Sequence, residues 1–87
     1  MTNVAATGPS PEQAAGQEQL HRSIREAIRA LSPKLRDALL LAQAGEYSYD
    51  EIGAMLHAPV GTIKWRVSEA RRVVRKRLAE FGFSDVG

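Results

Sequence analysis

The stretch YSYDEIGAMLHAPVGTIKWRVSEARR (residues 47–72) decides the fold, because it holds two helix-start signals separated by a short break. Ser48 and Glu51 have the spacing of a capping box, which begins a helix. Pro59 follows the break and begins the next helix at its first position, where the missing N–H needs no partner. Two helices joined by two or three residues are typical of a helix-turn-helix, although a plain helical hairpin has the same spacing.

Two more helices are expected before this stretch. Ser10–Pro11 reads as an N-cap followed by a first-turn proline, and apolar residues at helical spacing continue from there. Gly16 weakens the first turns, so we expect the firm part of this helix to begin near Gln17. Ser32–Pro33 repeats the cap-and-proline pattern and begins the second helix, which ends where Gly45 stands as a C-terminal cap.

No segment alternates between polar and apolar residues with a period of two, so no strands are expected. The fold class is therefore all-α, a four-helix domain with a C-terminal helix-turn-helix covering residues 10–82. Residues 1–9 are small and polar and predict a disordered tail or linker, and residues 83–87 a C-terminal tail. Eighty-seven residues make one domain at most.

The composition excludes several classes of protein. The absence of cysteine excludes disulfides and thiolate metal sites, and the two histidines lie far apart without a carboxylate pattern. We expect no metal or cofactor, and no enzyme, because the sequence has no phosphate loop and no nucleophile–base pair. No apolar run approaches the roughly 20 residues of a membrane span, and no signal peptide is evident. The protein is expected to be cytoplasmic.

The net charge of +2 conceals an asymmetry along the chain. Residues 1–58 carry five Lys or Arg against seven Asp or Glu, whereas residues 59–87 carry seven against three. Basic charge gathered at one end favours a polyanionic partner such as nucleic acid. On charge alone, a solvated helix face explains the same residues equally well.

The helix expected from Pro59 to about Phe81 has two different faces when it is placed at 100° per residue. Its apolar seam consists of Val60, Ile63, Val67, Ala70, Val74 and Leu78. The far side carries Gly61, Trp65, Glu69, Arg72 and Lys76, with Lys64, Ser68 and Arg75 along one flank. Trp65 therefore cannot reach the seam, and we expect it to be exposed.

This far face suits the major groove of DNA, which admits an α-helix. Gly61 and Thr62 lie at the helix N-terminus, where free N–H groups favour a phosphate. Trp65 offers apolar area for a thymine methyl group, and the cationic residues suit guanine or phosphates. The expected DNA-binding residues are Gly61, Thr62, Lys64, Trp65, Arg66, Ser68, Glu69, Arg71, Arg72 and Arg75.

Glu69 is the one acidic residue in this set, and phosphates repel it unless it is engaged. It either accepts a hydrogen bond from a cytosine amino group or pairs with an arginine at helical spacing. Arg66 lies three residues before it and Arg72 three residues after it, so both are within reach. We favour the pairing with an arginine.

LSPKLRDALLL (residues 31–41) and the stretch at 47–72 resemble region 4 of sigma factors, in particular the extracytoplasmic-function group of the sigma-70 family. The resemblance spans Leu31 to about Leu78, and PVGTIK followed by Arg66 and Ala70–Arg71 is its most specific part. It implies a domain that reads the −35 element of promoter DNA and directs RNA polymerase to promoters in transcription initiation. It also implies docking on the flap of the RNA polymerase β subunit and binding by an anti-sigma factor.

By matched position, the resemblance places Lys64, Trp65, Arg66, Ser68, Glu69 and Arg71 on or beside the family's DNA-reading stretch, with Thr62 facing a phosphate. Three residues depart from the pattern. Trp65 replaces a common serine, and Glu69 replaces a common arginine, so we expect either an unusual preferred DNA sequence or a low affinity for DNA. His57 replaces the usual glycine, and we expect it to be a turn residue in the left-handed region.

Two other interpretations stay open. The first is a region 4-like interaction module that binds an anti-sigma factor or RNA polymerase without reading DNA, which Trp65 and Glu69 favour because an exposed tryptophan is a common interface anchor. The second is a response-regulator type of DNA-binding domain. Nothing in the sequence matches region 2 of a complete sigma factor, so the chain is either a domain cut from a longer factor or a stand-alone homologue. The linker-like residues 1–9 favour the cut domain.

Overall fold

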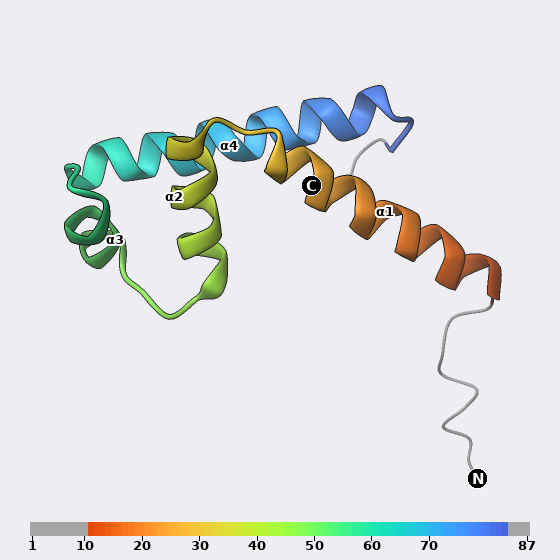
Figure 1. Cartoon of the computed structure of the whole chain (residues 1–87), viewed down its shortest axis with the longest axis horizontal. Helices are drawn as coiled ribbons and strands as arrows, with labels where there is room; N and C mark the ends of the chain where they lie inside the picture. The colour runs from red at the N-terminus through yellow and green to blue at the C-terminus, as the bar shows by residue number, and fades with distance from the viewer. Residues whose placement is uncertain (1–10, 84–87) are drawn as a thin grey trace, which may run out of the picture.

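The computed structural model describes residues 11–83, with side chains from residue 13 onward. This part of the chain forms four helices and no strand: α1 (Pro11–Arg29), α2 (Pro33–Ala44), α3 (Tyr49–Leu56) and α4 (Val60–Glu80). In Figure 1, α4 runs across the molecule, α2 crosses it, α3 lies at one end and α1 extends away from the other. The expected all-α, four-helix fold is confirmed. The expected tail at 1–9 and the Ser10 cap lie outside the described residues.

Helix α4 organises the core, because it contacts all three other helices. Its buried residues are Ile63, Val67, Ala70, Val74 and Leu78. The other helices and the α1–α2 connection complete the core with Ala27, Leu31, Ala38, Leu39 and Ile52. The expected seam is confirmed except at Val60, which is only half-buried because it is the first residue of the helix. Each fully buried valine, leucine or isoleucine side chain contributes about 1.5–3 kcal/mol of hydrophobic stabilisation.

The start of α3 confirms the capping box. The Glu51 N–H donates to Ser48 Oγ at 3.1 Å, and the Ser48 N–H donates to Glu51 Oε1 at 2.7 Å. Two of the N–H groups near this helix end are thereby satisfied by side chains. Within α3, Ile52 and Gly53 are buried, whereas Tyr49 and Leu56 are half-buried.

The turn between α3 and α4 reverses the chain at His57, whose φ of 58° and ψ of 47° lie in the left-handed region, as expected. The Ala58 N–H donates to the Gly53 carbonyl at 2.9 Å. A Cβ atom at Gly53 would lie 2.6 Å from the Ala58 carbonyl oxygen, so the turn folds back this closely only over a glycine. Pro59 is the N-cap of α4 rather than its first helical residue, because its ψ of 154° is extended.

Helix α1 begins at Pro11, the first helical position that the Ser10–Pro11 pattern predicts. The helix continues through Gly16 without a break, and the weaker first turns expected before Gln17 stay a prediction. Glycine costs only about 1 kcal/mol relative to alanine in a helix interior, which is too little to break the helix. Residues 13–19 are nevertheless all exposed, and packing against the core begins at Leu20.

Both ends of α2 are fixed by local structure. Ser32 occupies the expected N-cap position, but its side chain makes no capping hydrogen bond, and Pro33 follows at the first helical position. Arg36 Nη1 donates to the Arg29 carbonyl at 3.3 Å and so connects α2 to the last residue of α1. Gly45 ends the helix in the left-handed conformation, with φ of 72°, as expected.

The end of α4 is a Schellman turn. The Phe83 N–H donates to the Leu78 carbonyl at 2.9 Å and the Gly82 N–H to the Ala79 carbonyl at 3.1 Å, with Gly82 at a φ of 94°. Phe83, the first residue of the expected C-terminal tail, packs partly buried against the core. The remaining tail residues, 84–87, are outside the described part of the chain.

Candidate nucleic-acid interface

The outer face of α4 is exposed because the opposite face is held in the core. Ile63 and Val67 are almost fully buried, whereas the Trp65 side chain between them is 62% exposed. Helical geometry causes this difference, since a residue two positions from a buried one points away from it. The expected exposure of Trp65 is confirmed, and its indole is free to contact a partner.

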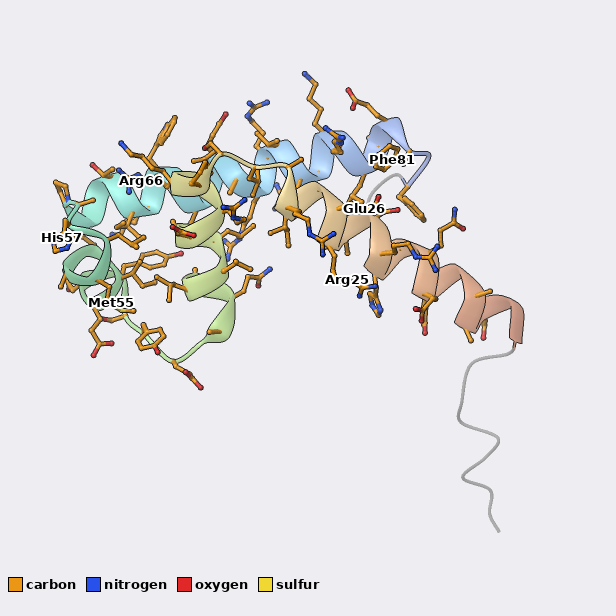
Figure 2. The ribbon with its side chains drawn as sticks, viewed as in Figure 1. Arg25, Glu26, Met55, His57, Arg66 and Phe81 are labelled. Carbon is orange, nitrogen blue, oxygen red and sulfur yellow. The ribbon has the colours of Figure 1, made fainter. Side chains whose placement is uncertain are left out.

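The start of α4 carries the other small and polar candidates. Gly61, Lys64 and Ser68 are exposed and Thr62 is half-buried. No side chain caps this helix start, so its first N–H groups keep the partial positive charge that favours an anion. Figure 2 shows His57 at the turn ahead of this end and Arg66 further along the helix.

Glu69 and Arg72 form a bidentate ion pair on the outer face. Arg72 Nε donates to Glu69 Oε1 at 3.0 Å, and Arg72 Nη2 donates to Oε2 at 2.7 Å. The hydrogen bond from Arg72 lowers the pKa of the Glu69 carboxyl, and the same contact raises the pKa of Arg72. The expected pairing of Glu69 with an arginine is confirmed, and its partner is Arg72 rather than Arg66.

A hollow of about 400 Å³ lies beside Trp65, and we call it the Trp65 hollow. It is formed where the start of α2 approaches the N-terminal half of α4. Its lining residues are Ser32, Lys34 and Leu35 from the α2 side and Thr62, Trp65, Arg66 and Glu69 from α4. Lys34 is a cation near the candidate interface that the sequence did not indicate, because it is far from α4 along the chain.

The opposite flank of α4 forms an apolar groove with α1 and α2. One hollow of about 160 Å³ is lined by Ile24, Ile28, Leu39, Gln43, Arg71, Val74, Arg75 and Leu78. A second, of about 230 Å³, is lined by Arg25, Ile28, Arg29, Arg36 and Leu40. Because the two share Ile28, we treat them as one surface and call it the arginine-rimmed groove.

The ten expected DNA-binding residues therefore do not form a single cluster. Thr62, Trp65, Arg66 and Glu69 line the Trp65 hollow, whereas Arg71 and Arg75 line the arginine-rimmed groove. The seam itself contained a signal of this separation, since Arg71 directly follows the buried Ala70 and precedes Val74 by three residues.

Within residues 11–83, no group of three His, Asp or Glu side chains is arranged to hold a metal ion. None of the described helices is long and apolar enough to cross a membrane.

The model of the family described as sigma-70, region 4, matches residues 21–74, which include all of α3 and most of α4. The chain belongs to the sigma-70 region 4 family.

Several curated sigma factors are similar to this region 4 chain. It is 35% identical over 79 residues to the ECF RNA polymerase sigma factor SigW of Bacillus subtilis, covering 91% of this chain and 42% of that protein. It is 35% identical over 77 residues to SigE of Mycolicibacterium smegmatis, covering 88% and 30%. It is 33% identical over 69 residues to the RNA polymerase sigma-H factor of Pseudomonas aeruginosa, covering 79% and 36%. The chain thus spans less than half the length of each of these relatives.

These relatives place the chain in region 4 of the extracytoplasmic-function group, as its sequence motifs indicated. The matched segment ends at Val74, so it includes the whole outer face from Gly61 to Arg72 but not the last turns of α4. Lys34, Arg25, Arg29 and Arg36, which line two of the hollows, lie within the same matched segment.

Proposed function

We propose that this region 4 domain recognises the −35 element of promoter DNA and so directs RNA polymerase to promoters in transcription initiation. One observation carries the proposal: α4 is fixed by its buried seam and leaves Trp65 exposed among Lys64, Ser68 and Arg72 on the other side. On this proposal the protein acts in the cytoplasm, in association with the nucleoid.

The N-terminal half of α4 lies in the major groove, which is about 12 Å wide and admits a helix. The N–H groups at Gly61 and Thr62 face a phosphate at the groove edge. Lys64 and Ser68 reach the edges of bases, and the Trp65 indole packs against a thymine methyl group. These contacts would give the domain its sequence preference, because only base contacts and DNA shape carry sequence information.

The remaining cations contribute affinity that does not depend on sequence. Arg66 and Lys34 flank the Trp65 hollow and suit phosphates on one side of α4. Arg71 and Arg75 lie toward the other flank and suit phosphates there only through their long, flexible side chains. We therefore rank these two below Lys64 and Arg66 as DNA contacts.

Trp65 supplies the test, since it is the only tryptophan in the chain. Titrating its fluorescence with a −35-type duplex at about 0.05 M and 0.2 M salt should show binding that weakens by about 0.9 log units per neutralised phosphate for each tenfold rise in salt. Lys64→Ala should weaken binding, and Lys34→Ala should lower the salt dependence. Absence of duplex binding at the lower salt concentration would refute the proposal.

A second function is supported by the arginine-rimmed groove. Its floor is apolar, its charged lining residues are Arg25, Arg29, Arg36, Arg71 and Arg75, and no carboxylate lines it. We propose that this groove holds protein partners, namely the flap of the RNA polymerase β subunit or an anti-sigma factor. If the domain binds only protein partners, it is an interaction module that reads no DNA.

The two functions are separated by paired variants. Arg25→Glu with Arg29→Glu should abolish binding to a flap fragment and leave duplex binding within about twofold, because exposed charges farther away than about 10 Å are screened by salt. Lys64→Ala should weaken duplex binding and leave binding to the flap fragment unchanged. Partner binding without any duplex binding by the unmodified chain would favour the interaction module.

A further inference from the structure

The Glu69–Arg72 ion pair occupies the outer face of α4 in the free protein. Both carboxylate oxygens of Glu69 accept from Arg72, and Arg72 uses its Nε and one terminal nitrogen. We infer that Glu69 acts as an internal substitute for a DNA phosphate, holding Arg72 and lowering the domain's sequence-independent affinity for DNA. This inference rests on the proposed DNA-binding function and adds a residue that sets the strength of binding.

The position of Arg72 along α4 indicates which part of DNA it would meet. It lies eleven residues after Gly61, which is about 16 Å along the helix axis. That distance exceeds the major groove width of about 12 Å. When the start of α4 is seated in the groove, Arg72 therefore faces the sugar–phosphate backbone rather than base edges.

A carboxylate and a phosphate compete for the same donors of an arginine. Each offers two oxygens at the spacing of the guanidinium fork, which is why arginine binds both in a bidentate manner. In this protein the carboxylate is three residues away on the same helix and is always available. A phosphate must displace Glu69 or bind the remaining N–H groups of a neutralised pair.

The exposure of the pair allows this exchange to happen. The Arg72 side chain is 60% exposed, so a phosphate can approach it without any change in the core. The Glu69 side chain is 26% exposed and lines the Trp65 hollow, which keeps its charge close to the expected DNA surface. Glu69 therefore opposes binding twice, by occupying Arg72 and by repelling phosphates directly.

The deciding experiment compares the full chain with Glu69→Gln, using a random-sequence duplex and a −35-type duplex. At about 0.05 M salt, Glu69→Gln should bind both duplexes on the order of tenfold more tightly, with a salt slope steeper by about 0.9, because one more phosphate is neutralised. The gain should be equal for the two duplexes, because phosphate contacts carry no sequence information.

Arg72→Gln and the double variant identify the cause. If Glu69 acts by holding Arg72, most of the gain from Glu69→Gln disappears in the Arg72→Gln background. Glu80→Gln is the matched control, since it removes the same charge from an exposed position on the same helix. Glu80→Gln should change duplex affinity by less than about twofold, because Glu80 is distant from the DNA major groove and its charge is screened by salt. Circular dichroism melting of each variant verifies that the fold is retained.

Each other outcome has a definite meaning. Unchanged or weaker binding of Glu69→Gln to the random duplex overturns the inference, as does an undiminished gain in the Arg72→Gln background. A loss confined to the −35-type duplex would mean that Glu69 reads a cytosine, and it also overturns the inference. Duplex binding by Glu69→Gln alone supports the inference while removing the proposed function from the unmodified chain. Binding by neither protein removes both.

Discussion

Helices α1 and α4 are the two longest elements of the domain, with 19 and 21 residues, yet they bury very different amounts of side chain. Five residues of α4 are buried, whereas α1 contributes Ala27 alone. Helix α4 contacts the three other helices, while α1 packs through its C-terminal half and leaves residues 13–19 exposed. Length and amphipathic pattern therefore do not decide which helix holds a small domain together. The number of other helices that pack against a helix decides this.

The largest effect should come from the α4 seam. Ile63→Ala removes a fully buried side chain and should lower the free energy of unfolding by about 2–5 kcal/mol. The matched change on α1, Leu20→Ala, removes a half-buried side chain and should cost less than half as much. Urea denaturation followed by circular dichroism measures both, and equal losses would show that α1 is as central to the core as α4.

The tight turn between α3 and α4 comes next. Gly53→Val places side-chain atoms where a Cβ alone would lie 2.6 Å from the Ala58 carbonyl oxygen, and should cost about 1–3 kcal/mol through overpacking. Gly61→Val is the control, because nothing lies within 4 Å of the corresponding position. Thermal melting distinguishes them, and similar melting temperatures would mean that the turn relaxes without cost.

A substitution that stabilises the start of α1 should have little effect on the core that α4 organises. Gly16→Ala meets no neighbouring atom and should favour the local helix by up to about 1 kcal/mol. Because residues 13–19 do not pack on the core, global unfolding should hardly change, while amide hydrogen exchange in this segment should slow severalfold. A marked rise in the melting temperature would show that the start of α1 unfolds together with the core.

The smallest stability effect is expected on the outer face of α4. Trp65→Ala should alter the free energy of unfolding by no more than about 0.5 kcal/mol, because the side chain lies outside the core. The same variant should lose duplex affinity or change its sequence preference. Chemical denaturation and binding to fluorescein-labelled DNA measure the two properties separately. A large stability loss without a binding change would identify Trp65 as a packing residue.

Much of the fold could be predicted because its signals are local. The capping box at Ser48, the left-handed turns at Gly45 and His57 and the seam of α4 depend on neighbours within a few residues. The start of α1 at Pro11 follows from its proline pattern, and a single glycine at position 16 does not interrupt the helix. The predicted helical position of Pro59 was wrong by one residue, because proline fixes φ but leaves ψ free to be helical or extended.

The site could be predicted only in part. The outward direction of Trp65 follows from helical period alone, so the sequence sufficed. Arg71 and Arg75 stay predicted DNA-binding residues, and the structure adds that α1 and α2 form a groove with their flank of α4. Lys34 joins the Trp65 hollow through a contact between α2 and α4, for which no linear spacing gives a signal.

By itself the sequence determined the four helices, their order, the buried seam and the exposed tryptophan, because capping and helical period act over a few residues. Tertiary structure decided which other helices lie beside each flank of α4. It also decided the partner of Glu69, since Arg66 and Arg72 are equally spaced from it along the chain. Arg66 lies half-buried beside the start of α2, whereas Arg72 remains exposed and forms the ion pair. The packing of α2 against α4 places Arg66 beside the start of α2 and leaves Arg72 in solvent.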